Sequence, residues 1–353
     1  MRSASAAILA VDGGNSKADV ALVAADGTLL AAVHGPSISH QAVGLEAALA
    51  NLRELVAKAA TDARIGWDVG RPVAGIGSFC VAGADFPSEE RMLHRAISTL
   101  GLVDELTVRN DTFGALRAGT DRPWGVVLIC GRGINGAGIA PNGATARFDA
   151  LGHISGDWGG GRGIGTAAHG ASVRARDGRG PRTVFERLVP EYFGLKTPAA
   201  VTRALYEGRI ADERLAEVAP VVFRAAAMGD AVARQILTRL STELVTMAAA
   251  LIRRLHLARL DPEVVLAGSV FHGEDATFYQ EIADGIHAVA PKATIVHLTA
   301  PPVLGAALLG LDGMSPGGAT PTEVDARLRS ALTAWRGRRS AGADAAASGR
   351  MSA

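Results

Sequence analysis

The apolar positions of the first 150 residues fall in short runs separated by glycine-rich turns. One apolar run over residues 7–11 leads into Asp12 and a turn, and a second run over residues 18–23 returns from that turn. Continuous apolar runs of this length, bounded by turn residues, are typical of strands that are buried on both faces. We therefore predict a β-hairpin over residues 7–23.

The same arrangement returns near the middle of the chain. Residues 125–130 form an apolar run, residues 131–136 a glycine-rich turn, and residues 137–140 a returning strand. A further hairpin signal follows each copy, Asp26-Gly27 in the first and Pro141-Asn142-Gly143 in the second. The chain therefore contains a diverged repeat, with one copy in each half.

The rest of the pattern alternates between strands and helices, which predicts an α/β protein. Apolar residues at helical spacing predict a helix over residues 45–64 and mostly helical structure over residues 167–258. We expect three further helices: one capped by Ser88, one over residues 113–118 and one from Pro302 to Gly310. Further strands are expected over residues 28–33, 72–81, 106–109, 144–148, 263–267 and 294–298.

Composition narrows the class of protein. A chain of 353 residues exceeds one usual core, so two domains are expected. The formal net charge is +1 and the 36 basic residues are spread along the chain, which argues against a nucleic-acid or anionic-membrane partner. No apolar run approaches the roughly 20 residues of a membrane span, and no signal-peptide pattern opens the chain. We expect a soluble, cytoplasmic protein.

The two cysteines, Cys80 and Cys130, each end an apolar run. Two isolated thiols form neither a paired metal motif nor a disulfide framework. They are interpreted as small core residues.

The turn of the first hairpin has the composition of a phosphate-binding loop. Asp12 is followed by Gly13, Gly14, Asn15, Ser16 and Lys17. Glycines allow the backbone N–H groups to approach an anion, and a hydroxyl, an ammonium and a carboxylate suit phosphate and its magnesium. An ordinary glycine-rich turn is the alternative. The second copy, Gly131-Arg132-Gly133-Ile134-Asn135, favours the phosphate interpretation, with one such loop in each half.

Asp111 lies between the end of a predicted strand and the start of a predicted helix. One interpretation is an N-cap aspartate, which needs no chemistry. The other is a general base that projects into the crevice beside the glycine hairpins. The position of Asp111 in the sequence favours neither.

Two loops are candidates for substrate contacts. Residues 34–41 are polar and broken, and they are equally compatible with a plain connector. Residues 152–165 contain seven glycines. Because ordering so many glycines costs backbone entropy, we expect a ligand-facing loop rather than a plain connector, with Asp157 as its most interesting polar group. His153 is interpreted as structural, since no further metal ligands lie nearby.

These motifs in this order resemble the sugar kinase, actin and heat-shock chaperone superfamily. Within it, the chain is similar to the BadF/BadG/BcrA/BcrD ATPase family, which includes N-acetylglucosamine and glucosamine kinases. The similarity spans roughly residues 5–312 and includes the late segment Val265-Leu266-Ala267-Gly268-Ser269-Val270, which looks like the adenosine motif.

The resemblance implies a two-lobed, ribonuclease H-like fold of the actin-like ATPases, with a duplicated β-hairpin/α core and a cleft between the lobes. We expect the N-terminal lobe over residues 1–118 and the C-terminal lobe over residues 119–299. A helix over residues 300–313 would return to the first lobe. In the tail over residues 314–353 we expect a helix to about Arg336 and disorder from Gly337.

The resemblance also assigns roles to residues, with ATP and Mg²⁺ as cofactors. Asp111 would be the general base that takes the proton from a sugar hydroxyl, on C6, and Asp12 would hold Mg²⁺ through water. ATP would be bound by Asp12, Gly13, Gly14, Asn15, Ser16, Lys17, Gly131, Arg132, Gly133, Asn135, Gly268 and Ser269. The sugar would be bound by Ser39, His40, Gly83, Asn110, Asp111, Gly156 and Asp157. A homodimer is a further expectation from the family.

Several positions depart from the family pattern. Arg132 and Ile134 replace small hydroxyl residues of the second loop, so we expect backbone contacts to phosphate there. The segment Ser37-Ile38-Ser39 replaces an asparagine, and Ala82 a serine, of the N-acetylglucosamine kinases. Because Asp157 could pair with an amine at C2, these departures slightly favour glucosamine over N-acetylglucosamine.

Two other classes of protein remain as alternatives. An activator ATPase of the same superfamily would share an iron–sulfur cluster across a dimer, and it would need exposed cysteine ligands. The placement of Cys80 and Cys130 argues against it. An ATP-dependent binding module would hydrolyse ATP slowly whatever sugar is present.

Overall fold

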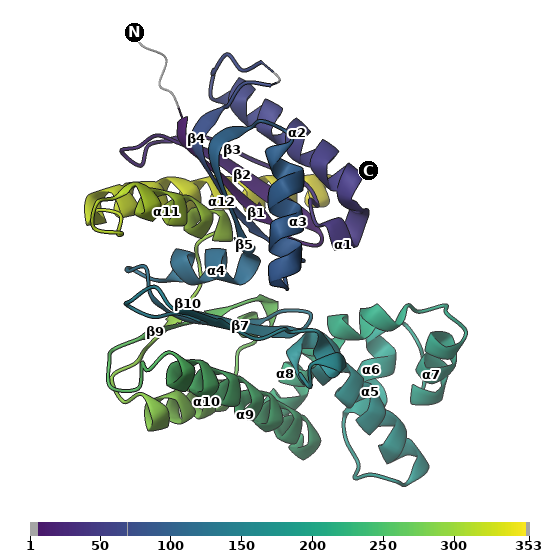
Figure 1. The fold of residues 1–353 in the computed structure, drawn as a ribbon. Coiled ribbons are helices and arrows are strands. Elements are labelled where there is room, and N and C mark those ends of the chain that lie inside the picture. Colours follow the sequence, from purple (N-terminus) through teal and green to yellow (C-terminus); the bar gives the residue numbers. More distant parts are fainter. Residues whose placement is uncertain (1–5, 69, 351–353) are drawn as a thin grey trace. The chain divides into compact units, whose positions relative to one another are not determined.

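The strands form two five-stranded sheets, one in each of two compact units (Figure 1). The computed structural model describes residues 6–68 and 70–350, with side chains described up to Arg338. Unit 1 combines the chain up to Gly125 with the chain from Leu298 onward, and unit 2 is Val126–His297. In the described part of the chain, no helix is both long and apolar enough to cross a bilayer.

The sheet of unit 1 has the strand order β3-β2-β1-β4-β5. β1 pairs with β2 and β2 with β3 in antiparallel fashion, whereas β1, β4 and β5 run parallel. The strands are β1 (Ala6–Gly13), β2 (Lys17–Val23), β3 (Leu29–Pro36), β4 (Ala74–Val81) and β5 (Val103–Asn110).

Helices cover both faces of this sheet, which is why β1, β2 and β4 are mostly apolar and buried, whereas the edge strand β5 carries several polar residues. Leu9, Val11 and the residues that share their face belong to one core cluster with α2 (Leu45–Asp62) and α3 (Pro87–Ser98). Ile8 and Ala10 belong to a second cluster on the opposite face. That face is covered by α4 (Asp111–Gly119), α11 (Pro302–Met314) and α12 (Thr322–Arg350).

The sheet of unit 2 repeats this arrangement. Its order is β10-β9-β6-β7-β8. If the strands of each sheet are numbered along the chain and this order is read from β8, both sheets have the order 3-2-1-4-5. Its strands are β6 (Gly125–Cys130), β7 (Ile134–Ile139), β8 (Thr145–Arg147), β9 (Glu263–Ala267) and β10 (Thr294–His297). The predicted duplication of a β-hairpin core is therefore present.

The helices of unit 2 lie between β8 and β9, except for α10 (Ala276–Val289), which lies between β9 and β10. Two of them, α9 (Ala231–Arg254) and α10, pack against each other, and α9 also packs on β7. The others form the helical part on the right of Figure 1: α5 (Gly160–Asp177), α6 (Phe185–Tyr192), α7 (Pro198–Tyr206) and α8 (Ala219–Ala227). Short 3₁₀ turns are η1 (Gly152–Ile154), η2 (Asp212–Val218) and η3 (Ser269–His272).

Several element boundaries differ from the sequence predictions. The N-cap of α3 is Phe86, with Pro87 at the first helical position, so Ser88 lies inside the helix. The polar segment 34–41 is partly regular, because β3 pairs with β2 as far as Pro36 and α1 (His40–Val43) follows. Helix α5 begins at Gly160, within the glycine-rich segment that we expected to be a loop.

The C-terminal helix is held to unit 1 by buried charges. Arg117 of α4 is only 2% exposed, and its guanidinium donates to Asp312 of α11 at 2.8 Å and to Asp325 of α12 at 3.0 Å. Leu328 and Leu332 are fully buried in the same core. Helix α12 extends to Arg350, beyond the predicted end at Arg336, into an alanine-rich segment of high helix propensity.

Candidate active site

The first glycine hairpin forms a tight turn between β1 and β2. The N–H of Gly14 donates to the carbonyl of Lys17 at 2.9 Å and closes the turn. A Cβ on Gly13 would lie 2.7 Å from the Ile38 side chain, so only glycine fits there. Asn15, Ser16 and Lys17 are exposed at the tip, where an anion could reach them.

A row of polar side chains crosses the unit 1 sheet at the base of this turn. Asp12 is paired across the strands with Asp19, and Asp19 with His34. Cys80 and Arg109 continue the row on the parallel side. Residues paired across neighbouring strands point to the same face, so these side chains share one face of the sheet.

Burial and negative neighbours raise the pKa of Asp12 well above its ordinary value. Burial is the largest cause, Asp111 and Asp19 add to it, and Lys17 opposes it. Asp19 itself is 6% exposed and is bonded to Nδ1 of His34 at 2.6 Å. The site therefore gathers more negative than positive charge, and a cation bound there would relieve the repulsion.

This charge excess fits magnesium. Mg²⁺ is usually held by one or two carboxylates, several waters and the phosphates of a substrate, rather than by a cage of protein ligands. Accordingly, no cluster of three or more His, Cys, Asp or Glu suited to a metal is found in residues 6–68 and 70–350. Asp12 is one of the carboxylates of this edge that could hold such an ion.

Asn110, and not Asp111, caps helix α4. The Oδ1 atom of Asn110 accepts from the Thr112 N–H at 3.1 Å, whereas Asp111 is the first residue of the helix. The N-cap interpretation of Asp111 is therefore wrong. Asp111 lies at the carboxyl end of β5, close enough to Asp12 to raise its pKa.

The predicted sugar-side residues of unit 1 lie around a connected set of hydrogen bonds. Nδ2 of Asn110, which is fully buried, donates to Asp85 at 2.9 Å. Gly83 has a φ of +83°, and a Cβ there would lie 2.9 Å from the ring of His40. Sequence reasoning gave Asp85 no role, although it lies only two residues after Gly83.

Two polar atoms of this region are buried without a partner. Oγ of Ser39 and Nδ1 of His40 make no hydrogen bond within the described part of the chain. Ser39 is only 1% exposed. Leaving a buried polar atom unpaired costs about 1–3 kcal/mol, so such atoms are candidates for ligand contacts.

The second glycine turn is held by the start of α5. Gly161 N–H donates to the Gly131 carbonyl at 2.7 Å, and Arg162 N–H to the Arg132 carbonyl at 2.9 Å. Gly160 has a φ of +65°, and a Cβ there would lie 2.5 Å from Gly133. The glycine-rich segment thus serves in part to bring α5 against the loop.

The side chains of the second loop diverge in direction. Ile134 is buried in the core of unit 2, whereas Arg132 is exposed. Asn135 accepts from the N–H of Gly136 at 2.7 Å. A Cβ on Gly131 or Gly133 would meet open space, so a ligand can approach the backbone of this loop.

A cavity of about 440 Å³ joins the second loop to the late glycine-serine segment within unit 2. Gly131, Arg132 and Ser269 all line it. Gly268, with a φ of +108°, lies so close to the Cys130 carbonyl that a Cβ would be 2.5 Å away. Two of the predicted ATP-binding motifs therefore meet in one cavity.

The walls of this cavity come from helices that the sequence presented only as scaffold. Phe223 of α8, His272 of η3 and Tyr192 of α6 line it. The Tyr192 hydroxyl donates to Glu217 at 3.2 Å, and the pKa of Glu217 is lowered, mainly by its bond to Arg214. These residues lie 60 to 140 positions from the loop, and no local pattern marks them.

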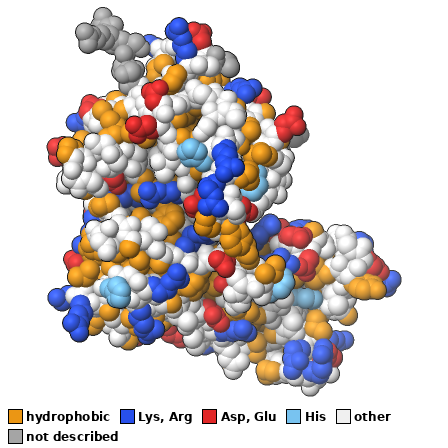
Figure 2. Space-filling model, viewed as in Figure 1, with side chains coloured by type: hydrophobic (Ala, Val, Ile, Leu, Met, Phe, Trp, Pro, Cys, Tyr) orange, Lys and Arg blue, Asp and Glu red, His pale blue; other side chains and the backbone are white. Residues whose placement is uncertain are grey.

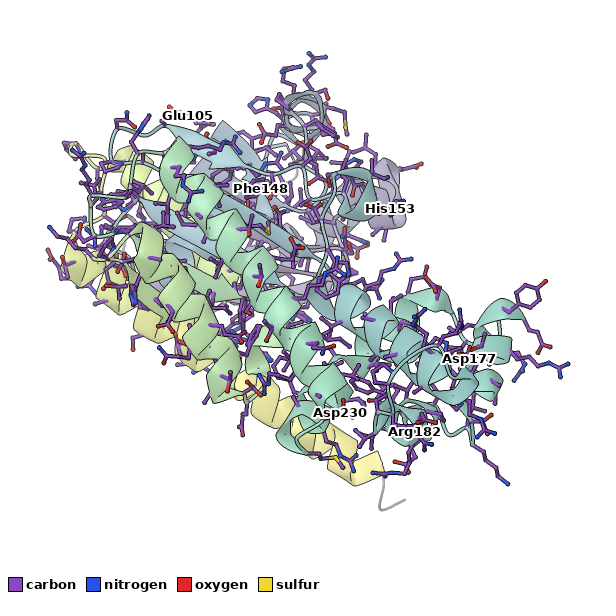
Figure 3. All side chains as sticks on the ribbon, turned by 90° about the horizontal axis from the view of Figure 1, so that it is seen from below. Glu105, Phe148, His153, Asp177, Arg182 and Asp230 are labelled. Atoms are coloured by element: carbon purple, nitrogen blue, oxygen red, sulfur yellow. The ribbon has the colours of Figure 1, made fainter. Side chains whose placement is uncertain are left out.

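Gly156 and Asp157 lie in a different part of unit 2. Neither residue lines the cavity, and Asp157 accepts from Oγ of Ser155 at 2.5 Å. His153 of η1, labelled in Figure 3, is exposed, and its carbonyl accepts from the N–H of Gly156 at 3.4 Å. The segment thus presents one partly buried carboxylate to ligands.

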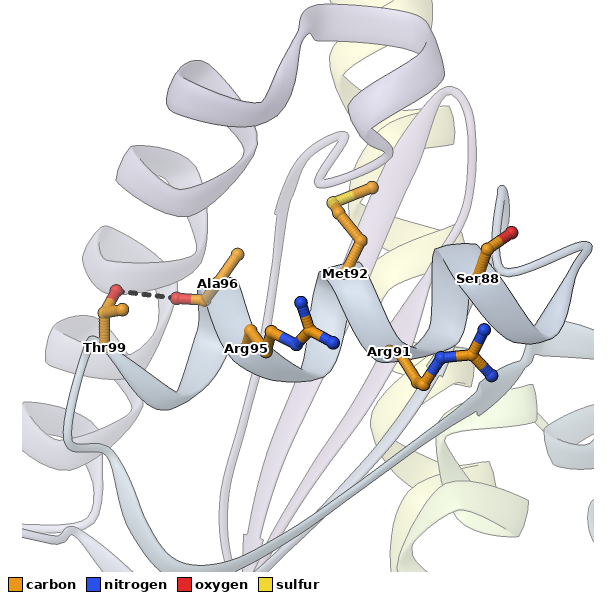
Figure 4. A pocket seen from close by; sticks show the side chains of 6 residues that line it. All are labelled: Ser88, Arg91, Met92, Arg95, Ala96 and Thr99. Carbon is orange, nitrogen blue, oxygen red and sulfur yellow. Dashed lines mark hydrogen bonds between the residues drawn. The ribbon is translucent and has the colours of Figure 1, made fainter.

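Other surface features carry none of the predicted site residues. A shallow hollow over α3 is lined by Ser88, Arg91, Met92, Arg95, Ala96 and Thr99 (Figure 4). On the face seen in Figure 2, acidic and basic side chains are scattered among each other. Both cysteines are buried and free, and burial raises the pKa of Cys130 to about 12.

Comparison with known proteins identifies the family. A model of the BadF/BadG/BcrA/BcrD ATPase family matches residues 9–310. The chain belongs to the BadF/BadG/BcrA/BcrD ATPase family. It is 26% identical over 305 residues to an N-acetylmuramic acid/N-acetylglucosamine kinase of Clostridium acetobutylicum, covering 86% of this chain and 97% of that protein. It is 26% identical over 318 residues to an N-acetyl-D-glucosamine kinase of Dictyostelium discoideum, again covering 86% and 97%.

Solved structures show the same fold. A candidate N-acetylglucosamine kinase of Chromobacterium violaceum superposes with a TM-score of 0.66 at 22% identity, covering 86% of this chain and 98% of that one. A ROK hexokinase of Thermus thermophilus gives a TM-score of 0.51 at 16% identity, covering 85% and 96%. The predicted family, the predicted α/β fold of the sugar kinases and the prediction of an enzyme of this kinase class are confirmed.

Proposed function

We propose that this BadF/BadG/BcrA/BcrD family member transfers the γ-phosphoryl group of Mg-ATP to the C6 hydroxyl of an amino sugar. The observation that carries the proposal is the placement of two carboxylates at one edge of the unit 1 sheet. Asp111 begins α4 directly after β5, and its charge is one of the causes that raise the pKa of Asp12. A candidate base and a candidate metal-binding carboxylate are therefore neighbours.

Asp111 acts as the general base in this proposal. It accepts the proton of the sugar hydroxyl while that oxygen attacks the γ-phosphorus and the bond to the ADP oxygen breaks. Its place in the first turn of α4 favours the ionised carboxylate that this role needs. Asn110 fixes the start of the helix through its bonds to Thr112 and Asp85.

The other residues bind and orient ATP and its metal. Asp12 would hold Mg²⁺, which supplies charge neutralisation at the transferred phosphate. In unit 1, Ser16 and Lys17 would contact the phosphates, and their exposure at the tip of the turn supports this role. In unit 2, the 440 Å³ cavity beside Gly131 and Ser269 is large enough for a nucleoside.

Fewer residues support the choice of sugar than support the binding of ATP. Ser39 and His40 offer unpaired buried atoms to sugar hydroxyls. Asp157 could pair with a protonated amine at C2, which slightly favours glucosamine, whereas the names of the two curated relatives specify N-acetylated sugars. We propose glucosamine first and N-acetylglucosamine second.

A coupled ATP turnover assay across glucosamine, N-acetylglucosamine and glucose, with wild type and Asp111→Asn, tests the function. We expect sugar-stimulated turnover in wild type and a loss on the order of 10²–10⁴-fold in kcat in the variant, with ATP binding retained. Asp104→Asn, an exposed carboxylate on the same β5 strand, is the matched control.

Two outcomes would contradict the proposal. Slow turnover that no sugar stimulates would favour an ATP-dependent binding module. Unchanged kcat in Asp111→Asn would remove that residue from the role of general base.

A further inference from the structure

A second pocket of unit 2 lies outside every residue assigned to ATP or sugar. Its volume is about 390 Å³, and it lies between α5, α9 and the turn that follows α5. Figure 3 labels Asp177 and Arg182, which flank that turn. The polar and aromatic side chains that line the pocket are Trp158, Arg174, Gln235 and Arg239.

The residues that line this pocket carry only positive charge, although Asp177 at the end of α5 is near enough to be affected: its pKa is lowered mainly by its bond to Arg179 and also by Arg174. Two guanidinium groups line it, from α5 and α9, and no carboxylate does. Arg239 stacks on Trp158, with its guanidinium carbon 3.9 Å from the ring centroid. Glu243, one turn further along α9, shares an adjoining hollow with Arg239.

The donors of both arginines remain largely unused. Within the described residues, Arg239 forms no ion pair, with Glu243 or with any other carboxylate. Arg174 donates one N–H to the Arg179 carbonyl at 2.8 Å. Each guanidinium has five N–H donors in a planar fork, which suits the oxygens of a phosphate.

We propose that this pocket binds the phosphate monoester of a small polyhydroxylated molecule. Arg174 of α5 and Arg239 of α9 would bind the phosphate, and the Gln235 amide would bind hydroxyl groups of the rest of the ligand. A volume of about 390 Å³ lies within the range of small-molecule pockets and accommodates a hexose phosphate. Stacking against Trp158 holds the Arg239 guanidinium flat, which lowers the entropy cost of a two-point contact.

The pocket is linked to the glycine-rich segment through Trp158. Asp157 precedes this tryptophan, and Gly159 follows it so close to α9 that a Cβ would lie 2.8 Å from Leu240. An occupied pocket would restrain this segment and so alter the KM for the sugar. This kinetic consequence depends on the proposed function, whereas binding does not.

Calorimetric titration with inorganic phosphate, glucose 6-phosphate and glucosamine 6-phosphate tests the site. Saturating Mg-ADP is present throughout, so that the glycine turns are occupied. For inorganic phosphate we expect one binding event with a Kd on the order of 1 mM or below. The sugar phosphates, which are the product of the proposed reaction or resemble it, can add a second event at the sugar site. Arg239→Gln should weaken it about tenfold or more, because a charge-assisted contact is lost. Arg174→Gln should weaken binding similarly.

Arg253→Gln is the matched control, since Arg253 is an exposed arginine of the same helix outside the pocket. It should bind like wild type. Binding should also change the tryptophan fluorescence of wild type, and Trp158→Phe should lose that change. Tighter binding of the sugar phosphates than of inorganic phosphate would show that the sugar part of the ligand contributes to affinity.

Two results would overturn the proposal: no binding by any of the three ligands in the presence of Mg-ADP, or equal affinities in Arg239→Gln and Arg253→Gln. If binding behaves as expected, phosphate should also change the sugar KM of wild type but not that of Arg239→Gln. A protein that binds phosphate but phosphorylates no sugar would refute the proposed function alone.

Discussion

Asp12 combines a proposed metal-binding role with an unfavourable environment in the folded chain. Its pKa is raised, mainly by burial and then by Asp111 and Asp19. A carboxyl whose pKa is higher in the folded than in the unfolded chain stabilises the fold only while it is protonated. Its contribution is fully present below the ordinary value of 3.8 and is lost as the pH rises through the raised pKa.

Asp12→Asn should therefore be more stable than wild type at pH 8 without Mg²⁺, with a Tm higher by roughly a few degrees. The difference should shrink as the pH is lowered toward 4. Thermal unfolding between pH 4 and 8 measures it, with Asp104→Asn as an exposed control. A difference that stays constant across this range would rule out the raised pKa as its cause.

Asp157 is the residue on which the choice of sugar depends. If its carboxylate pairs with a C2 ammonium, Asp157→Asn should raise the KM for glucosamine about tenfold and leave the KM for glucose nearly unchanged. Steady-state kinetics with both sugars measure this ratio. Equal increases for both sugars would refute the pairing.

At single positions, the sequence predicts a feature most directly where its signal lies in adjacent residues. The glycine turn with Asp12 is recognisable from adjacent residues. The function of Asp111 was ambiguous because an N-cap and a general base occupy the same place in the sequence. Only the structure shows that Asn110 is the cap. The pairing of Asp19 with His34 needed the strand register, although a charge inside an apolar strand was a usable signal.

Among the elements, the strands were the easiest to predict. The inner strands, such as β1, β4, β6 and β9, are short, mostly buried apolar runs with turn residues at their ends. The start of α5 was missed because three consecutive glycines have low helix propensity. Its position is set by contact with the Gly131–Gly133 turn, which is tertiary and invisible in a local window.

This contact makes Gly160 a sensitive position. A Cβ there would lie 2.5 Å from Gly133, and the φ of +65° disfavours any other residue. Gly160→Ala should displace the second loop, raise the KM for ATP several-fold and lower the free energy of unfolding by about 1–3 kcal/mol.

The matched variant is Gly163→Ala in the same helix, where a Cβ would meet only ordinary contacts at 3.9 Å or more. It should leave the KM for ATP unchanged. Nucleotide titration and chemical denaturation compare the two. If both variants bind ATP like wild type, the packing of α5 does not position the loop.

At the scale of the whole chain, the buried charges around Arg117 connect three helices of unit 1. Asp325→Asn would leave this buried guanidinium with Asp312 as its remaining carboxylate partner in the described structure. Removing one partner of a buried ion pair costs about 3–5 kcal/mol. We expect a loss of this order in chemical denaturation.

Glu323→Gln is the control for this prediction, because Glu323 is exposed in the same turn of α12. It should change stability by less than about 0.5 kcal/mol. If both variants have wild-type stability, α12 does not depend on these charges for its attachment.

The division of the chain itself has a consequence for biosynthesis. Unit 2 is a continuous segment, whereas unit 1 needs both the first 125 residues and those from Leu298 onward. A ribosome completes unit 2 before it has made Asp312 or Asp325, the acidic partners of Arg117. Until then, the first half of the chain has Arg117 without its acidic partners, and the sheet face that α11 and α12 cover is open. During this interval, the exposed apolar face makes the nascent chain prone to aggregation.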